Sequence, residues 1–333
     1  MNIYEIAERA GVSIATVSRV LNGSEKVSPK TAARIKSIIK EEGYRPNAFA
    51  RGLTTASMRL VGVLCTDLRD SFYAEAVALL QAELRRRGFD TLLGCTGNEE
   101  AGIRKQLSYM AEKQTDAVFA IGSGFLGATD ALREAAGRAP LVLINAKIEG
   151  ENIYSVYCDE TDAVEGAVYR LLKSGAKSFC FLQNEDAFSG RRKEEGFLRG
   201  MSQGEIPLQD TRVLAVENSV EGGSAAIEAL LREGFCPDAV IAAEDLIAIG
   251  AQKALLKAGF SRFVVGCDNS SLCECATPTL TSIDNHLEIL CREAVAIMKA
   301  IFKKETPPRE FVCHATLVLR ESFSDEPKKK PRA

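Results

Sequence analysis

Residues 6–23 read IAERAGVSIATVSRVLNG, and this stretch decides the fold of the N-terminal region. It holds two short helical patterns that are joined by only a Gly-Val dipeptide, and glycine commonly ends helices. The second pattern, residues 14–21, places apolar side chains on one face at i, i+3, i+4 spacing and leaves a polar outer face. Two helices with so short a turn predict a helix-turn-helix whose second helix enters the major groove of DNA.

Capping residues set the limits of three helices in this region. Asn2 can cap the first helix, and the glutamate three residues later is the usual partner of a capping box. Ser13 can cap the second helix. Ser28 can cap a third helix, which Pro29 opens and Gly43 ends. The pattern therefore predicts a small all-α domain.

The charges of the chain are unevenly divided. Residues 1–59 contain ten Lys and Arg against five acids, a net charge of +5, whereas the remainder carries 32 basic and 40 acidic residues, or −8. A basic head on an acidic body predicts that the head contacts a polyanion and that the body does not.

Length and composition predict a globular protein without a membrane span. The 333 residues are enough for two or three domains, and 46% hydrophobic and 26% charged residues are near the averages of globular chains. No apolar run approaches the roughly 18 residues of a membrane helix, and the first ten residues do not resemble a signal peptide. Ten scattered cysteines and only two histidines predict a cytoplasmic protein with reduced thiols and no metal site.

The body alternates apolar strand patterns with amphipathic helical patterns, and the series restarts near residue 160. This alternation predicts two parallel sheets with helices on both faces. The predicted strands are 60–65, 89–95, 117–121, 140–145, 156–158, 178–182, 212–216, 239–242 and 263–266. The predicted helices of the body are 72–87, 99–113, 129–136, 161–174, 190–202, 221–233 and 245–258.

The stretch 6–23 resembles the DNA-binding head of the LacI/GalR family of bacterial transcriptional regulators, and residues 43–53, GYRPNAFARGL, resemble the hinge helix of that family. Weaker similarities continue through the body, at residues 72–75, 243–245, 265–269, 277–281 and 317–322. The resemblance covers nearly the whole chain. It implies an N-terminal all-α helix-turn-helix domain followed by an α/β effector domain. That domain has two periplasmic-binding-protein-like lobes with Rossmann-like parallel sheets, and the chain crosses three times between them.

The pattern and the resemblance together predict how the chain is divided into domains. The ranges are 1–45 for the DNA-binding domain, 46–59 for a hinge helix and linker, 60–323 for the effector-binding and dimerisation domain, and 324–333 for a disordered tail. Lobe 1 is expected at about 60–158 and 286–313, and lobe 2 at about 159–285 and 314–323.

The outer face of residues 14–21 is expected to read bases. Arg19 can bind a guanine edge with two hydrogen bonds, and Ile14 and Ala15 can contact thymine methyl groups. Residues 47–53 are too short for a stable isolated helix, so they form either a plain linker or, as the resemblance implies, a helix that folds on the operator with Leu53 wedged into the minor groove. The predicted DNA-binding residues are Ser13, Ile14, Ala15, Thr16, Ser18, Arg19, Asn22, Asn47, Ala50, Arg51 and Leu53.

Open α/β sheets bind ligands beyond the carboxyl ends of their strands, which here places the ligand between the two lobes. Carboxylates, amides and cations there can bind adjacent hydroxyl groups, and aromatic rings can cover the apolar face of a sugar. The resemblance assigns effector contact to Asp268 and to the basic residue three positions before Gly196, which is Lys193 here and usually arginine in the family. The predicted effector-binding residues are Asp70, Phe72, Tyr73, Asn145, Lys147, Phe188, Arg192, Lys193, Asp245, Asp268 and Asn269.

One motif indicates a different function. Residues 122–127 read GSGFLG, which fits the G-x-G-x-x-G fingerprint of a dinucleotide-binding loop after a strand. Against this, the strand is the third of its lobe, and the position expected for a ribose-binding acid holds Asn145 or Lys147. A flexible loop at the mouth of the cleft is the simpler interpretation.

These patterns predict a sequence-specific transcriptional regulator, a repressor, and not an enzyme. It is expected to bind a pseudo-palindromic DNA operator as a homodimer and to respond to a small-molecule effector, a sugar or sugar derivative, with no cofactor and no membrane contact. The alternative is an α/β nucleotide-binding protein or enzyme that carries a DNA-binding head. A third hypothesis is a transcriptional regulator that responds to a partner protein instead of a small molecule.

Overall fold

The computed structural model describes residues 2–21, 26–43, 57–184 and 188–323. The chain divides into two compact units, Met1–Arg59 and Leu60–Ala333. Within the described ranges, no helix is both long enough and apolar enough to cross a membrane.

Among its described residues, the N-terminal unit has three helices around a small core. They are α1 (Ile3–Arg9), α2 (Ile14–Leu21) and α3 (Pro29–Glu41). The predicted capping box is present, since the Asn2 side chain accepts hydrogen bonds from the first turn of α1 and Glu5 bonds back to the Asn2 backbone. Ile6, Val17 and Ile35, one from each helix, are fully buried together. The helix-turn-helix predicted from the sequence is confirmed.

The first sheet of the body has six strands in the order β11-β5-β4-β3-β1-β2, and all neighbouring strands are parallel. Its strands are β1 (Leu60–Cys65), β2 (Asp90–Cys95), β3 (Ala117–Ile121), β4 (Leu141–Ile144), β5 (Ile153–Asp159) and β11 (Glu310–His314). All five residues of β3 are buried, as expected for a parallel strand covered on both faces. This sheet and its helices form lobe 1.

The second sheet has the order β12-β10-β9-β8-β6-β7, and it is parallel except for the antiparallel pair β10–β12. Its strands are β6 (Phe179–Gln183), β7 (Thr211–Ala215), β8 (Ala239–Ala242), β9 (Phe263–Cys267), β10 (Thr281–Asp284) and β12 (Thr316–Val318). This sheet and its helices form lobe 2. The strand pattern of the sequence did not predict β10, β11 or β12.

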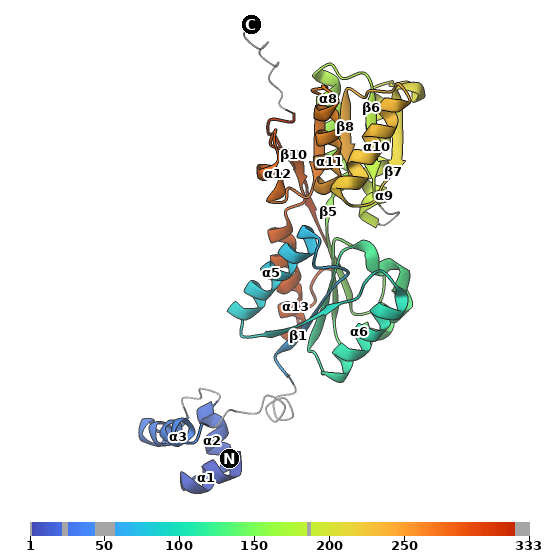
Figure 1. Cartoon of the computed structure of the whole chain (residues 1–333). Helices are drawn as coiled ribbons and strands as arrows, with labels where there is room; N and C mark the ends of the chain where they lie inside the picture. Colours follow the sequence, from blue (N-terminus) through green and yellow to red (C-terminus); the bar gives the residue numbers. More distant parts are fainter. Residues whose placement is uncertain (1, 22–25, 44–56, 185–187, 324–333) are drawn as a thin grey trace. The chain divides into compact units, whose positions relative to one another are not determined.

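Helices cover both faces of each sheet (Figure 1). In lobe 1, α5 and α13 pack on one face and α6 and α7 on the other; in lobe 2, α8 and α9 face α10 and α11 across the sheet. The helices are α5 (Ser71–Arg86), α6 (Glu100–Glu112), α7 (Thr129–Ala136), α8 (Glu160–Lys173), α9 (Phe188–Gln203), α10 (Val220–Arg232), α11 (Asp245–Lys257), α12 (Leu272–Cys275) and α13 (Leu287–Phe302). Two short 3-10 segments are η1 (Ser123–Ala128) and η2 (Leu208–Asp210).

The chain passes between the two lobes three times, after β5, after β10 and after β11. Between the second and third crossings, α13 packs against α5 and the strands β4 and β5 of lobe 1. Strand β12 then pairs with β10 of lobe 2. The predicted fold class, a helix-turn-helix unit with a two-lobed α/β body, is confirmed.

Candidate functional site

The outer face of α2 presents side chains that the sequence assigns to DNA. Ile14, Ala15 and Arg19 are exposed. Ser13 caps the helix, because its Oγ accepts a hydrogen bond from the Thr16 backbone at 3.3 Å and lies 2.9 Å from Thr16 Oγ1. The first helical turn is therefore held in a fixed position beside the exposed residues.

The remaining predicted DNA-binding residues divide into two groups. Ser18 is half-buried on α2. The others lie outside the described residues, and they are Asn22, Asn47, Ala50, Arg51 and Leu53. Contact of any of these residues with DNA stays a prediction.

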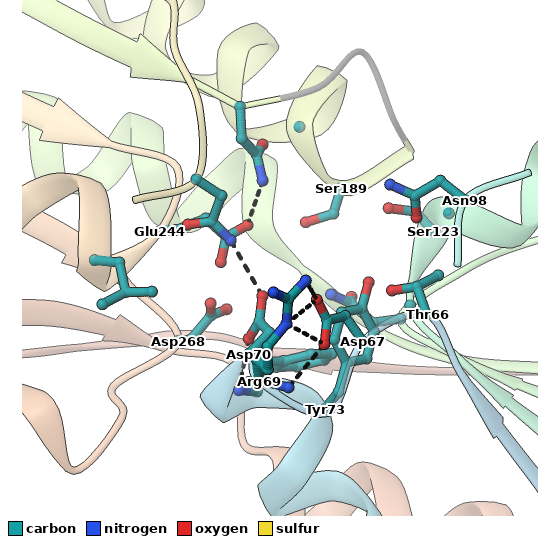
Figure 2. Close-up of a pocket in the computed structure, with 18 of the residues that line it drawn as sticks. Thr66, Asp67, Arg69, Asp70, Tyr73, Asn98, Ser123, Ser189, Glu244 and Asp268 are labelled. Atoms are coloured by element: carbon teal, nitrogen blue, oxygen red, sulfur yellow. Dashed lines mark hydrogen bonds and ion pairs between the residues drawn. The ribbon is translucent and has the colours of Figure 1, made fainter. Parts of the chain in front are cut away.

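A cavity of about 840 Å³ lies between the two lobes (Figure 2). Most of its wall is formed by residues that follow the carboxyl ends of strands, where open α/β sheets bind ligands. Lobe 1 contributes Thr66, Asp67, Arg69, Asp70, Phe72, Tyr73, Gly97, Asn98, Gly122, Ser123, Gly124 and Asn145. Lobe 2 contributes Asn184, Ser189, Gly190, Lys193, Val216, Glu217, Asn218, Glu244, Leu246 and Asp268.

The first turn of α5 carries the aromatic part of the lobe 1 wall. Asp70 caps this helix, and its Oδ1 accepts a hydrogen bond from the Phe72 backbone at 2.9 Å. Tyr73 packs against Gly122, where an added Cβ would lie 2.5 Å from a ring carbon and where φ is +91°. Only glycine suits both constraints. Burial raises the pKa of the Tyr73 hydroxyl, so it remains a proton donor at neutral pH.

Lys193 on α9 is a buried cation in the lobe 2 wall. Its side chain is 3% exposed, and its Nζ donates a hydrogen bond to the Ala243 carbonyl oxygen at 2.7 Å. Three carboxylates surround the ammonium group, with Glu160 Oε1 at 3.5 Å, Glu244 Oε1 at 3.6 Å and Asp268 Oδ1 at 3.9 Å. Desolvation acts to lower the pKa of Lys193, but these carboxylates, Glu244 first, outweigh it and raise the pKa well above its usual value. Lys193 is therefore charged and fixed in place.

Burial disfavours ionisation of three carboxyl groups in and beside this wall. Burial, and after it the charge of Asp268, raises the pKa of Glu244 well above its usual range. Burial also raises the pKa values of Glu160 and Asp70. Ser189 partly compensates for the burial of Glu160, because its Oγ donates a hydrogen bond to Glu160 Oε1 at 2.7 Å. The wall thus holds more carboxyl groups than its single ammonium group can pair with.

Two asparagines bind carboxylates of the wall, and one of these contacts joins the lobes. Asn218 Nδ2, after β7 of lobe 2, donates a hydrogen bond to Asp70 Oδ2 of lobe 1 at 3.1 Å. Asn184 Nδ2, after β6, donates to Glu244 Oε1 at 2.8 Å. The two lobes therefore touch across the cavity through polar side chains.

The structure brings together just over half of the predicted effector-binding residues. Those that line the cavity are Asp70, Phe72, Tyr73, Asn145, Lys193 and Asp268. Those that do not are Lys147, Phe188, Arg192, Asp245 and Asn269. These five residues lie in segments that follow strands, but their side chains contact other parts of the protein.

Three of these five residues contact the crossing strands. Lys147 Nζ lies 2.8 Å from Glu310 Oε1, and an Arg192 nitrogen lies 2.6 Å from Asp159 Oδ1. Phe188 packs edge-on against an aromatic ring of β5, with 5.5 Å between the centroids. These side chains stabilise the region where the chain passes between lobes.

The other two residues serve the interior of lobe 2. Asp245 is 4% exposed and accepts hydrogen bonds from Ser282 Oγ at 2.6 Å and from the Ser270 backbone at 2.7 Å. Burial raises the pKa of Asp245 to about 6. Asn269 Oδ1 accepts a hydrogen bond from Arg320 at 2.8 Å. Neither side chain lines the cavity.

The sequence analysis missed several polar residues of the wall. They are Thr66, Asp67, Arg69, Asn98, Ser123, Asn184, Ser189, Glu217, Asn218 and Glu244. The rule that ligands bind after strands would have found eight of them, because all except Arg69 and Ser189 lie within three residues of the end of a predicted strand. The loop at residues 122–127 does line the cavity, but it forms η1, and its first glycine makes room for Tyr73.

A helix-turn-helix unit joined to a two-lobed body with a polar cavity between the lobes is the architecture of a DNA-binding regulator with a periplasmic-binding-protein-like domain. Residues 59–317 match the family described as periplasmic binding proteins and sugar binding domain of the LacI family. Residues 2–47 match the bacterial regulatory proteins of the lacI family. The chain belongs to the LacI family of bacterial transcriptional regulators.

Individual proteins show the same relationship along the whole chain. An HTH-type transcriptional regulator of Lachnoclostridium phytofermentans is 37% identical over 330 residues, which are 97% of this chain and 99% of that protein. The solved complex of the transcriptional regulator CelR with cellobiose is 28% identical, with a TM-score of 0.70 over 97% of this chain and 100% of that one. The Lac repressor dimer bound to operator and the anti-inducer ONPF has a TM-score of 0.86 at 22% identity, over 97% of this chain and 98% of that one, and it shows a shared fold.

Proposed function

We propose that this LacI-family regulator is a homodimeric repressor whose affinity for a pseudo-palindromic operator changes when a sugar or sugar derivative binds between its lobes. The observation that carries the proposal is the cavity of about 840 Å³, which both lobes line. A ligand there touches both lobes, so it can favour one arrangement of them over another. This differential binding is what an effector needs in order to act on a distant DNA site.

The chemistry of the wall supports a polyhydroxylated ligand. Carboxylates such as Asp70 and Asp268 can each accept hydrogen bonds from two adjacent hydroxyl groups. The rings of Phe72 and Tyr73 lie 5.5 Å apart at the lobe 1 side and can cover the apolar face of a sugar ring. The related regulator CelR was solved with cellobiose. A sugar is therefore the first class of ligand to test.

The DNA-binding side of the proposal assigns base reading to α2. Arg19 is exposed there and would bind a guanine edge, while Ile14 and Ala15 would contact thymine methyl groups. We assign residues 1–45 to the DNA-binding domain, 46–59 to a hinge that folds on the operator, and 60–323 to the effector domain. Leu53, outside the described residues, would be the wedge in the minor groove.

Fluorescence anisotropy with labelled fragments from upstream of the gene tests this proposal. Neutral sugars, amino sugars, phosphosugars, purines and NAD are titrated into the protein–DNA complex. A sugar should shift operator affinity about 5- to 150-fold, the usual range of coupling between two sites. A response to NAD or purines alone would instead support the nucleotide-binding alternative.

The Arg19→Ala variant tests the DNA-binding side separately. It should lose the preference for operator over random DNA while keeping salt-sensitive, non-specific affinity, because phosphate contacts supply the latter. Equal weakening on both DNAs would contradict the assignment of Arg19 to base reading.

A further inference from the structure

The charges that line the cavity are unbalanced. Among the lining residues that the structure describes, five are acids and two are bases. The acids are Asp67, Asp70, Glu217, Glu244 and Asp268, and the bases are Arg69 and Lys193. A neutral sugar needs no such excess, since hydroxyl groups both donate and accept hydrogen bonds.

The two bases are too few to balance the inner carboxylates. Arg69 binds Asp67 at 2.6 Å, and its side chain is 92% exposed. Lys193 donates to a backbone carbonyl and lies 3.5 Å from Glu160, a buried acid behind the wall. Its ammonium also lies 3.6 Å from Glu244 and 3.9 Å from Asp268, so one positive charge is shared among three carboxyl groups. The wall therefore holds more carboxyl groups than its cations balance.

The carboxylates left facing the cavity come from both lobes. They are Asp70 of lobe 1 with Glu244 and Asp268 of lobe 2, and Figure 2 shows all three turned toward the same part of the pocket. Their charges influence one another, since Asp268 raises the pKa values of both Glu244 and Asp70. Carboxylates held this close are stabilised most by a cation placed between them.

The amide groups of the wall also offer acceptors. Asn145 is 5% exposed and lines the cavity, and its Oδ1 has no hydrogen-bond partner among the described residues. Asn218 Oδ1 is likewise buried without a partner in that part of the chain, while its Nδ2 is occupied by Asp70. Asn184 Nδ2 is occupied by Glu244. The amide donors of Asn184 and Asn218 are thus used within the protein, whereas the amide acceptors of Asn145 and Asn218 are left for a ligand.

We propose that the effector carries a protonated amino group, as an amino sugar does, and that this ammonium binds between Asp70, Glu244 and Asp268. This inference rests on the proposed function, because it takes the cavity as the effector site. Three N–H donors of an ammonium group match the surplus of acceptors, and its charge matches the surplus of carboxylates. The same surplus repels phosphosugars and sugar acids.

Calorimetry with ligands that share one carbon skeleton tests the proposal on the full-length protein. One series is cellobiose, the glucosamine disaccharide with the same linkage, and its N-acetylated form; the others are glucose, galactose and mannose with their 2-amino and 2-acetamido derivatives. The pH is kept below the pKa of the ligand ammonium. We expect an amino sugar to bind about 10- to 100-fold more tightly than the neutral and N-acetylated members of its series.

A pair of variants shows whether the preference comes from this wall. Glu244→Gln keeps the shape of the side chain and removes its charge, so the ratio of amino-sugar to neutral-sugar affinity should fall about 10-fold or more. Glu228→Gln makes the same change on α10, where Glu228 forms an exposed ion pair with Lys257, and it should keep the ratio. Circular dichroism checks that both variants are folded.

The possible failures are distinguishable. A neutral or phosphorylated sugar that binds as tightly as its amino derivative and shifts operator affinity overturns the amino-group inference and leaves the proposed function standing. An amino-sugar preference that Glu244→Gln does not reduce also overturns the inference. If no sugar of any series binds or changes operator affinity, the inference and the sugar effector fail together.

Discussion

The two walls of the cavity occupy equivalent strand-end positions but differ in where they keep their charges. In lobe 1, the pair formed by Asp67 and Arg69 is exposed, and neutral side chains such as Ser123 line the deeper wall. In lobe 2, Glu217 is exposed, but the cluster around Lys193 is inside: the side chains of Lys193 and Glu160 are 3% and 2% exposed. Asp70 is the half-buried exception in lobe 1.

This difference indicates where ligand orientation is decided. A buried charge has to be satisfied by the protein itself, so the cluster around Lys193 is fixed before any ligand arrives. An exposed pair is screened by solvent and can rearrange freely. We infer that lobe 2 fixes the polar groups of the ligand, while lobe 1 supplies ring contacts and closes over it.

The strongest test of this comparison is Lys193→Met, which removes the ammonium and keeps the chain length of the side chain. Glu160, 1% exposed, would then be buried without its cation. Removing one partner of a buried ion pair costs about 3–5 kcal/mol, so we expect a fall of this size in the free energy of unfolding. Urea denaturation measures it. Lys257→Met, at an 82% exposed lysine of the same lobe, is the control and should leave stability unchanged.

The loss of stability in Lys193→Met should depend on pH, and the direction of that dependence can be predicted. Folding raises the pKa values of Glu160 and Glu244, so the folded state binds protons more tightly than the unfolded state. The cost of burying these two carboxyl groups therefore falls as the pH falls toward the ordinary glutamate pKa of about 4.3. The raised pKa of Lys193 keeps its own contribution intact below about 10.4, across this range. The stability deficit of Lys193→Met should therefore narrow between about pH 8 and pH 5. A deficit that widens on acidification would contradict the buried cluster.

The sequence predicted the fold well because its strands are covered on both faces and are therefore continuously apolar. Its failures at β10 and β11 have physical reasons. In β10, Thr281 and Ser282 are fully buried, and their hydroxyl groups are satisfied by hydrogen bonds, so hydropathy carries no signal there. In β11, exposed and half-buried residues alternate along the edge of the sheet. A search for continuously apolar runs therefore misses such strands.

The sequence predicted the site less completely because a shift of one position along the chain changes the direction in which a side chain points. Glu244 and Asp245 are neighbours, yet Glu244 lines the cavity and Asp245 is buried within lobe 2. Glu244 has extended backbone angles at the cap of α11, whereas Asp245 is the first helical residue. Sequence patterns place helix ends only to within a few residues. The choice between the two acids therefore needed the structure.

Gly122→Ala tests the packing of the lobe 1 wall. The added methyl group would meet the Tyr73 ring, and the φ of +91° is unfavourable for alanine. A loss of about 1–3 kcal/mol in stability is expected from the backbone conformation alone. Gly127→Ala, in the same motif, has open space and no positive φ, so it should cost much less. Equal effects would show that Gly122 does not serve Tyr73.

Asn218→Ala tests the contact between the walls. It removes the hydrogen bond to Asp70 that joins lobe 2 to lobe 1. The loss of one such bond, about 0.5–1.5 kcal/mol, should weaken the closed arrangement of the lobes more than it weakens the fold. Small-angle scattering should report a larger radius of gyration for the effector domain, with little change in the denaturation midpoint. An unchanged radius together with reduced stability would make this bond a feature of folding alone.

Arg69→Ala should have the smallest effect, and it completes the comparison. Its partner Asp67 holds it through side-chain hydrogen bonds, and these lower the pKa of Asp67, but both side chains face solvent. Exposed ion pairs gain little because water screens the charges and because ordering two long side chains costs entropy. We therefore expect the urea midpoint of Arg69→Ala to equal that of the parent at any pH where both are folded. A shift comparable with that of Lys193→Met would show that charge in lobe 1 is as deeply embedded as charge in lobe 2, and the contrast between the two walls would no longer hold.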